Sequence, residues 1–289
     1  MKHYLGTVVT GIVTDENEKA FFVQKFGVTF QLSKDELENS LTIGDAVTGF
    51  LYENSQKKAI MTTKIPDIRQ EYYGWATVTQ VRKDLGVFVD IGLPDKDIVV
   101  SLDELPNVTT LWPKKNNRLY VGLTVDKKDR LWATLADDAL IKATAKKANE
   151  QLKNQDITAT VFRLKLAGTS VITSDGYIGF LHPSERPYEP TLGEELSLRV
   201  IGVRPDGVLN VSMRPRAFEA IPEDAAMILM MLEKHPAHEL PYGDKSDPDA
   251  IRSMFGISKG QFKRAVGSLL KAKKIIQENN HIRLVEEAE

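Results

Sequence analysis

The chain has 289 residues, of which 42% are hydrophobic and 27% charged, a composition typical of globular proteins. It has no cysteine, which excludes disulfides, thiolate metal sites and a thiol nucleophile, and its net charge of −2 argues against strong non-specific binding to duplex nucleic acid. We find no signal-peptide pattern and no run near the ~20 apolar residues of a transmembrane helix, and therefore expect a cytoplasmic protein without a membrane partner.

A repeated pattern of short strand-like segments runs through most of the chain. Each copy has about five such segments, separated by turn residues such as Asp206-Gly207. Five strands in roughly 60–70 residues leave exposed edges unless the sheet closes into a barrel, and that closed form is the OB architecture, which commonly binds single-stranded oligonucleotides. We therefore predict a mainly β chain with three tandem five-stranded OB-fold barrels at residues 1–66, 67–136 and 154–216.

The second copy carries the clearest pattern. Apolar and polar residues alternate in its first segment, as in a strand with one buried face. A turn at residues 82–86 leads into an apolar return strand. The five strands expected in this copy cover residues 74–81, 87–91, 98–101, 119–126 and 131–135.

A different pattern separates the second and third copies. Residues 137–153 are rich in alanine and lysine and contain no proline or glycine. Asp137 and Asp138 stand at the start, where the helix dipole favours acidic side chains. This segment predicts a linker helix.

The C-terminal segment, residues 217–289, has helical patterns followed by a hairpin. A first helix begins near Pro222, and a second covers residues 248–255. Ser258 and Gln261 form a capping box at the start of a third helix. Two strands then flank Asn279-Asn280. Three helices followed by a two-stranded hairpin indicate a winged-helix domain.

The repeats resemble the S1 RNA-binding domain, most closely at residues 86–89 and 179–185. The whole arrangement resembles the conserved virulence factor B family of Firmicutes, which combines S1-type domains with a C-terminal winged helix. The resemblance covers nearly the full chain. It implies an RNA-binding regulatory protein that influences gene expression, including that of virulence factors. It does not imply a catalytic activity, and we expect no cofactor.

The resemblance also implies binding residues. Phe22 and Phe88 match the aromatic residue on the second S1 strand, and His182 matches the S1 histidine, with Phe180 close by. No unit keeps the full set, and the first unit is the most degenerate. The departures from the S1 pattern are Leu85, Ser33, Ser101 and Ser170.

Basic residues gather in the turns of the second unit and in the winged helix, mostly on its third helix. The binding candidates among them are Arg82, Lys83, Lys127, Lys128, Arg130, Lys259, Lys263, Arg264, Lys271 and Arg283. Trp112, Tyr120 and Trp132 are near the first group in sequence. Arg214 belongs to a thinner set in the third unit, with Arg163, Lys165, Arg199, Arg204 and Arg216. In the winged helix, Glu278 is the one counter-charge that we expect.

Each of these features also has a purely structural interpretation. The aromatic residues could belong to a barrel core, and His182 could bond the backbone at the Pro183 turn. Basic residues often form only a solvated surface. A protein adaptor on ribosome or polymerase, and duplex DNA binding by the winged helix, therefore remain alternatives to RNA binding. An enzyme is not indicated, since nucleotide-binding glycine motifs are absent and His235 and His238 have no third metal ligand.

Overall fold

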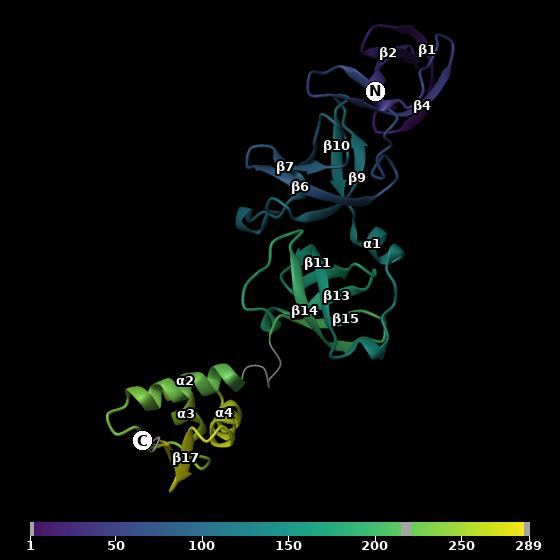
Figure 1. Ribbon diagram of the computed structural model, residues 1–289. Coiled ribbons are helices and arrows are strands. Elements are labelled where there is room, and N and C mark those ends of the chain that lie inside the picture. The colour runs from purple at the N-terminus through teal and green to yellow at the C-terminus, as the bar shows by residue number, and fades with distance from the viewer. Residues whose placement is uncertain (1–2, 215–220, 286–289) are drawn as a thin grey trace. The chain divides into compact units, whose positions relative to one another are not determined.

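The computed structural model describes residues 3–214 and 221–285 (Figure 1). The chain divides into two compact units, with the division after Met213. The first unit holds three closed five-stranded barrels, and the second holds helices with a small sheet. The prediction of a mainly β chain with a helical C-terminal part is confirmed. The expected boundary between residues 216 and 217, and Arg216 itself, lie outside the described residues.

The three barrels share one strand order, in which the third strand runs parallel to the fifth and the other neighbours are antiparallel. Barrel 1 consists of β1 (Val8–Glu16), β2 (Ala20–Lys25), β3 (Val28–Ser33), β4 (Ala46–Glu53) and β5 (Ala59–Thr62). Barrel 2 consists of β6 (Gly74–Arg82), β7 (Gly86–Asp90), β8 (Ile98–Ser101), β9 (Arg118–Val125) and β10 (Leu131–Leu135). Barrel 3 consists of β11 (Asp156–Lys165), β12 (Gly168–Thr173), β13 (Ile178–Leu181), β14 (Glu195–Val203) and β15 (Leu209–Ser212).

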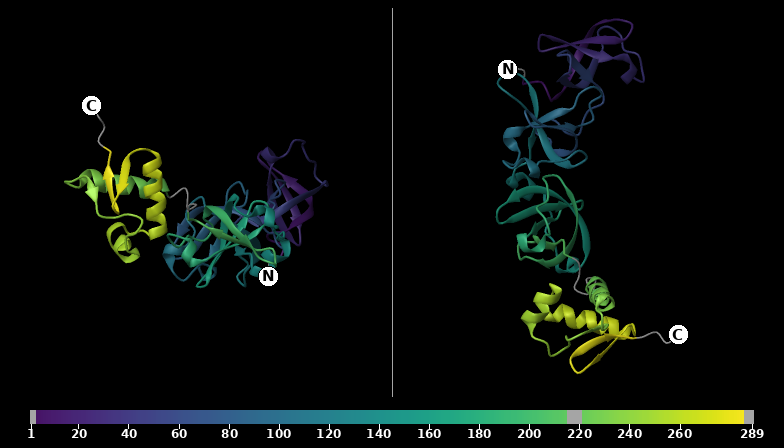
Figure 2. Two further views of the ribbon diagram at one scale, coloured as in Figure 1. Left: turned by 90° about the horizontal axis from the view of Figure 1, so that it is seen from below. Right: turned by 90° about the vertical axis from the view of Figure 1, so that its left-hand side faces the viewer.

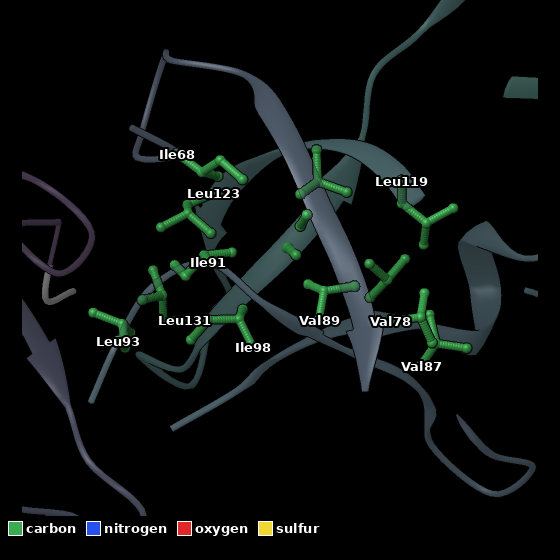
Figure 3. Packing of buried hydrophobic residues seen from close by; sticks show 14 of the residues in the cluster. Ile68, Val78, Val87, Val89, Ile91, Leu93, Ile98, Leu119, Leu123 and Leu131 are labelled. Carbon is green, nitrogen blue, oxygen red and sulfur yellow. The ribbon is translucent and has the colours of Figure 1, made fainter. Parts of the chain in front are cut away.

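Every second side chain along the strands points inward and fills the interior of each barrel. In β7, Val87 and Val89 are fully buried, and Phe88 between them lies on the outer face, because successive side chains of a strand point to opposite sides. Val78 and Ile98 join the two valines in the centre of barrel 2 (Figure 3). The outer faces of the strands are therefore free to carry other functions.

Barrel 1 and barrel 2 share a continuous apolar core. Leu5, Phe50 and Tyr52 of barrel 1 pack in the same buried cluster as the core of barrel 2. The Tyr52 hydroxyl also donates a 2.7 Å hydrogen bond to Asp95 of barrel 2. Burial and this hydrogen bond raise the pKa of Tyr52 far above its usual value. Barrel 1 is thus packed against barrel 2 and not merely tethered to it.

Backbone hydrogen bonds connect barrel 2 to barrel 3. Leu192 N–H donates to the Leu111 carbonyl, and Arg118 N–H donates to the Gly193 carbonyl, both at 3.0 Å. The Leu192 side chain is buried in the core cluster of barrel 2. The β13–β14 connection of barrel 3 therefore completes the surface of barrel 2.

The expected linker helix over 137–153 is wrong in length. The helix α1 covers only Asp138–Thr144 and begins with Asp137 as its N-cap. Beyond it, Lys146 N–H bonds the Gly176 carbonyl and Ala148 N–H bonds the Gly207 carbonyl, both in turns of barrel 3. These long-range bonds replace the helical ones, so the chain continues extended up to a short 3-10 turn at Glu150–Leu152.

The second unit has the winged-helix order, as predicted. It contains α2 (Ile221–Lys234), β16 (Glu239–Leu240), α3 (Pro248–Phe255), α4 (Lys259–Lys271), β17 (Ile275–Glu278) and β18 (His281–Leu284). Figure 2 shows the helices and the C-terminal hairpin from two further sides. Both halves of the Ser258–Gln261 capping box form. The sequence did not predict β16, whose two residues pair with β18 and are too few for a periodic pattern.

Candidate nucleic-acid interface

The outer faces of the second, third and fifth strands carry the aromatic candidates. In barrel 1, Phe21 is a core residue with 1% of its surface exposed, and Phe22 is half-buried on the outer face. Phe88 lies at the matching place in barrel 2. In barrel 3 that place is taken by Ser170, and its neighbour across the strands is Phe180. The core interpretation of Phe22 and Phe88 is therefore wrong.

In barrel 2 the strand register places two aromatic side chains in one row. Phe88 pairs with Val99 on β8, and Val100 stands beside Ala133 on β10. Because alternate residues share a face, Val99 has Trp132 as its outer-face neighbour. We call Phe88, Val99 and Trp132 the outer row of barrel 2. In the sequence Trp132 stood out only as a neighbour of the basic candidates, although alternation in β10, with buried Leu131 and Ala133 on either side, could have placed it on the outer face.

The β9–β10 turn holds an arginine against the end of this row. The Arg130 guanidinium lies 5.1 Å from the centre of the Trp132 ring. Asp126 accepts hydrogen bonds from the Arg130 backbone N–H, the Arg130 side chain and the Trp132 indole N–H, at 2.8–3.1 Å. These bonds, the backbone one above all, hold the pKa of Asp126 far below its usual range. The carboxylate therefore fixes both side chains while balancing the charge of Arg130.

Basic residues flank the outer row of barrel 2 at both ends. β7 is antiparallel to β8, and β8 is parallel to β10, so the β6–β7 turn and the β9–β10 turn lie at opposite ends of this face. Lys127 and Lys128 are exposed in the β9–β10 turn. Lys83 is exposed at the other end, beside Arg82.

Three other side chains of barrel 2 are less available for nucleic-acid contacts than the sequence indicated. Arg82 forms a 2.6 Å ion pair with Asp84, and this hydrogen-bonded contact lowers the pKa of the carboxyl group. Trp112 is buried and donates its indole N–H to the Pro106 carbonyl at 2.6 Å. Tyr120 packs against Trp75 on the β6–β9 side of the barrel. Trp112 and Tyr120 therefore lie outside the row.

Barrel 3 has a corresponding outer row with a different composition. Ser170 pairs with Phe180, and Phe180 pairs with Asn210 across the parallel β13–β15 contact. The Arg204 guanidinium lies 4.6 Å from the centre of the Phe180 ring, and Arg204 Nε donates to Asn210 Oδ1 at 2.8 Å. Arg204 and Asn210 were not among the principal binding candidates, because only the three-dimensional register brings them to Phe180.

His182 has a structural role as well as an exposed ring. Its Nδ1 accepts a 3.2 Å hydrogen bond from Ser184 N–H, so His182 is the N-cap of the 3-10 turn Pro183–Glu185. Ser33 and Ser101 cap the equivalent turns of barrels 1 and 2 in the same way. The backbone interpretation of His182 is therefore confirmed. The exposed imidazole ring lies 6.5 Å from the Phe180 ring, centre to centre.

Some basic residues of barrel 3 are held in ion pairs. Arg163 and Lys165 contact the two carboxylate oxygens of Asp138 at 2.8 and 2.6 Å. The hydrogen bond from Lys165, followed by that from Arg163, lowers the pKa of Asp138. These two residues therefore join α1 to barrel 3 and are poor candidates for phosphate contacts. Arg214 is exposed just after β15.

The winged helix presents one basic face on α4. Lys263, Arg264 and Lys271 are exposed, and Lys259 is half-buried at the start of the helix. The opposite face is buried in the core and consists of Phe262, Ala265, Val266 and Leu269. Gly267 lies among the basic residues with open space around it.

The expectation of a single counter-charge in the winged helix is wrong. Lys263 Nζ lies 4.0 Å from Asp244, and Arg283 Nε lies 3.3 Å from Glu239. The second contact arises because β16 pairs with β18 and sets Glu239 opposite Arg283. Arg283 is therefore the weakest of the candidates in this domain.

The described residues contain no cluster of three or more histidine, aspartate or glutamate side chains that could hold a metal ion. No helix among them has the length and apolar character needed to cross a membrane.

Comparisons with known proteins agree with this arrangement. Residues 5–64 match the S1 domain, residues 73–134 the first S1-like domain of CvfB, residues 141–215 the second domain of the virulence regulatory factor CvfB, and residues 226–284 the CvfB-like winged helix domain.

Two relatives and one solved structure are similar over most of their length. The uncharacterized protein YitL of Bacillus subtilis is 39% identical over 95% of this chain and 91% of its own. Conserved virulence factor B of Staphylococcus epidermidis is 37% identical over 86% and 82%. The crystal structure of a multidomain protein with nucleic acid binding domains from Streptococcus pneumoniae is 48% identical, covers 98% of this chain and 99% of its own, and has a TM-score of 0.71.

Proposed function

Because this chain belongs to the conserved virulence factor B family, we propose that it is an RNA-binding regulatory protein that modulates gene expression, including that of virulence factors. The RNA is single-stranded, or has single-stranded parts, and is held by several weak sites on the barrels together with the winged helix. The protein acts by binding and not by catalysis.

The observation that carries this proposal is the outer row of barrel 2. Phe88 and Trp132 offer two aromatic side chains on one face, and Lys83 and Lys127 stand near its opposite ends. Bases stack on such rings with ~1–3 kcal/mol per base and little sequence preference, and lysines attract the phosphates. Strands 2 and 3 and the turns beside them are the surface that OB folds use for oligonucleotides.

The outer row of barrel 3 supports a second site. Phe180 has a guanidinium over its ring, and Asn210 adds an amide that can bond a base edge. Because hydrogen bonds and packed side chains connect barrels 2 and 3, binding at one site raises the effective concentration of the same RNA at the other. Two weak sites on one strand can thus give useful affinity.

A second candidate function is duplex DNA binding by the winged helix. The exposed Lys263 and Arg264 on α4 favour it, because a helix of this kind enters the major groove in helix-turn-helix proteins. A protein-interaction adaptor, for example on ribosome or polymerase, is favoured by the net charge of −2.

The test is fluorescence anisotropy of labelled oligo-U RNA, oligo-A RNA and duplex DNA against the full chain, at low and high salt. We expect salt-sensitive binding of single-stranded RNA that Phe88→Ala weakens. Tyr188→Ala is the matched control, since it removes an exposed aromatic ring outside the outer rows. No RNA binding even at low salt would contradict the proposal and favour the adaptor. Binding of duplex DNA alone would move the function to the winged helix.

A further inference from the structure

The β2–β3 turn of barrel 1 contains an aromatic residue in an unfavourable backbone conformation. Lys25 pairs with Val28, so Phe26 and Gly27 form a two-residue hairpin loop, with φ of 53° and 71°. This turn requires positive φ at both positions, for which Asn-Gly is strongly preferred. A bulky side chain with positive φ is a genuine outlier, because its Cβ crowds the backbone. Phenylalanine at this place therefore works against folding.

The Phe26 ring is nevertheless held in one position. It stacks on Tyr4, with ring centres 5.5 Å apart and planes only 14° from parallel. Tyr4 in turn meets the ring of Phe30 edge-on at 5.7 Å, and Phe30 is fully buried. Phe26 is thus the outer layer of an aromatic stack that is anchored in the barrel core. It keeps 58% of its surface exposed, and the space beside Gly27 is open.

Basic residues gather at the same end of barrel 1. Lys25 places its ammonium group 5.4 Å from the centre of the Phe26 ring. Gln31 on β3 lies beside Ile60 on the parallel β5, so the β4–β5 turn ends next to the start of β3. Lys57 and Lys58 are exposed in that turn. The end of the barrel that carries Phe26 therefore presents several positive charges, which is the sign that phosphates require.

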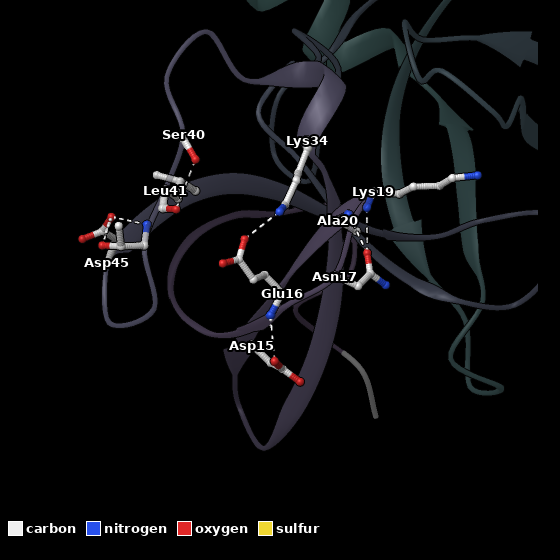
Figure 4. Close-up of polar contacts among 10 residues, drawn as sticks. Asp15, Glu16, Asn17, Lys19, Ala20, Lys34, Ser40, Leu41 and Asp45 are labelled. Atoms are coloured by element: carbon white, nitrogen blue, oxygen red, sulfur yellow. Dashed lines mark hydrogen bonds and ion pairs between the residues drawn. The ribbon is translucent and has the colours of Figure 1, made fainter.

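The opposite end of barrel 1 is acidic. Asp15 and Glu16 end β1 there, and Glu16 holds the ammonium group of Lys34 in a 2.6 Å ion pair (Figure 4). On the outer face of β2, Phe22 lies four residues before Phe26, which is a span of about 13 Å along a strand. Exposed positive charges and a stacked aromatic pair thus occur together at the Phe26 end of barrel 1, which makes it the better end for binding a nucleic acid.

We propose that barrel 1 binds single-stranded RNA by stacking a base on the Tyr4–Phe26 pair, with Lys25, Lys57 and Lys58 attracting the adjacent phosphates. This site is separate from the outer rows of barrels 2 and 3 and uses the turn between strands 2 and 3. The inference rests on the proposed RNA binding and extends it to the barrel whose sequence pattern is the most degenerate.

The test uses three substitutions of Phe26 in the full chain, with RNA affinity measured by anisotropy on oligo-U and oligo-A and stability by thermal unfolding. Phe26→Asn suits the turn, so it should raise Tm while RNA affinity falls about fivefold or more. Phe26→Leu keeps an apolar side chain and the unfavourable φ but loses the ring, and should weaken binding equally. Phe26→Tyr keeps the ring and should bind as the wild type does.

Phe88→Ala, measured in parallel, separates the two proposals. If the wild type binds RNA and Phe88→Ala weakens this binding, while Phe26→Asn and Phe26→Leu leave it unchanged, the barrel 1 site is overturned and the proposed function stands. If the wild type binds no RNA, both proposals fail. Crosslinking with 4-thiouridine RNA gives an independent check, in which the barrel 1 site requires a crosslink at Tyr4, within residues 25–27 or within residues 57–58.

Discussion

Arg204 holds its guanidinium 4.6 Å above the ring of Phe180. A flat cation over an aromatic ring extends the surface on which a base can stack, and its Nε bond to Asn210 keeps it from turning away. Lysine could supply the charge at this position but not the flat surface.

We therefore expect Arg204→Lys to weaken binding of single-stranded RNA several-fold, although the charge is conserved. Phe180→Ala should cost about tenfold, within the range of ~1–3 kcal/mol for one stacked base. Anisotropy titrations with oligo-U at fixed salt measure both effects. Equal affinity of Arg204→Lys and the wild type would show that only the charge matters.

Substitution of Asp126 should loosen the β9–β10 turn and lower stability. Folding depresses the pKa of this carboxyl, so its contribution is present above the unfolded pKa of ~3.9 and is lost as the pH falls through the folded value. Asp126→Asn should therefore lower Tm at pH 7, and the difference from the wild type should shrink as the pH falls below ~4. Thermal unfolding across this pH range measures it, and a difference that persists at low pH would argue against the charged hydrogen bonds as its cause.

Tyr52→Phe tests the contact between barrels 1 and 2. It removes the hydroxyl that donates to Asp95 and leaves the packing of the ring in place. We expect a loss of about 1–2 kcal/mol in the free energy of unfolding, measured with urea. Tyr188→Phe is the matched control, because its hydroxyl bonds Glu194 within barrel 3 at an exposed site. A similar loss in both variants would indicate that the hydrogen bond between the barrels stabilises the protein no more than an exposed one within a barrel does.

The double substitution Lys263→Ala/Arg264→Ala tests α4. If both residues contact phosphates, the slope of log K against log salt should become less negative in this variant, by about 1.4 for single-stranded RNA or about 1.8 for duplex DNA. Lys234→Ala/Arg252→Ala removes the same charge from exposed positions on α2 and α3 and should leave the slope unchanged. Equal slopes for the two double variants would show that Lys263 and Arg264 on α4 do not contact the nucleic acid.

Local patterns in the sequence predicted most of the secondary structure. The strands expected at residues 98–101 and 131–135 match β8 and β10, and the helix expected at 248–255 matches α3. Alternation and capping residues determine these elements within a few positions, so the sequence shows them directly.

Features that depend on distant contacts could not be predicted. The linker helix ends early because Lys146 and Ala148 find backbone partners in barrel 3. The neighbours Val99 and Trp132 come together through a parallel pairing that no local pattern reveals. The β6 strand also has a bulge between Val78 and Gln80, which changes the side to which later residues point. Sequence alternation alone is unreliable beyond such a point.

The shared capping role of Ser33, Ser101 and His182 allows the three repeats to differ at this position. The fold asks only for a side-chain acceptor at this position, and serine and histidine both provide one. The residue here can therefore be small or aromatic while the turn keeps its cap. The exposed chemistry at this place thus differs between the repeats, while the fold that carries it is the same.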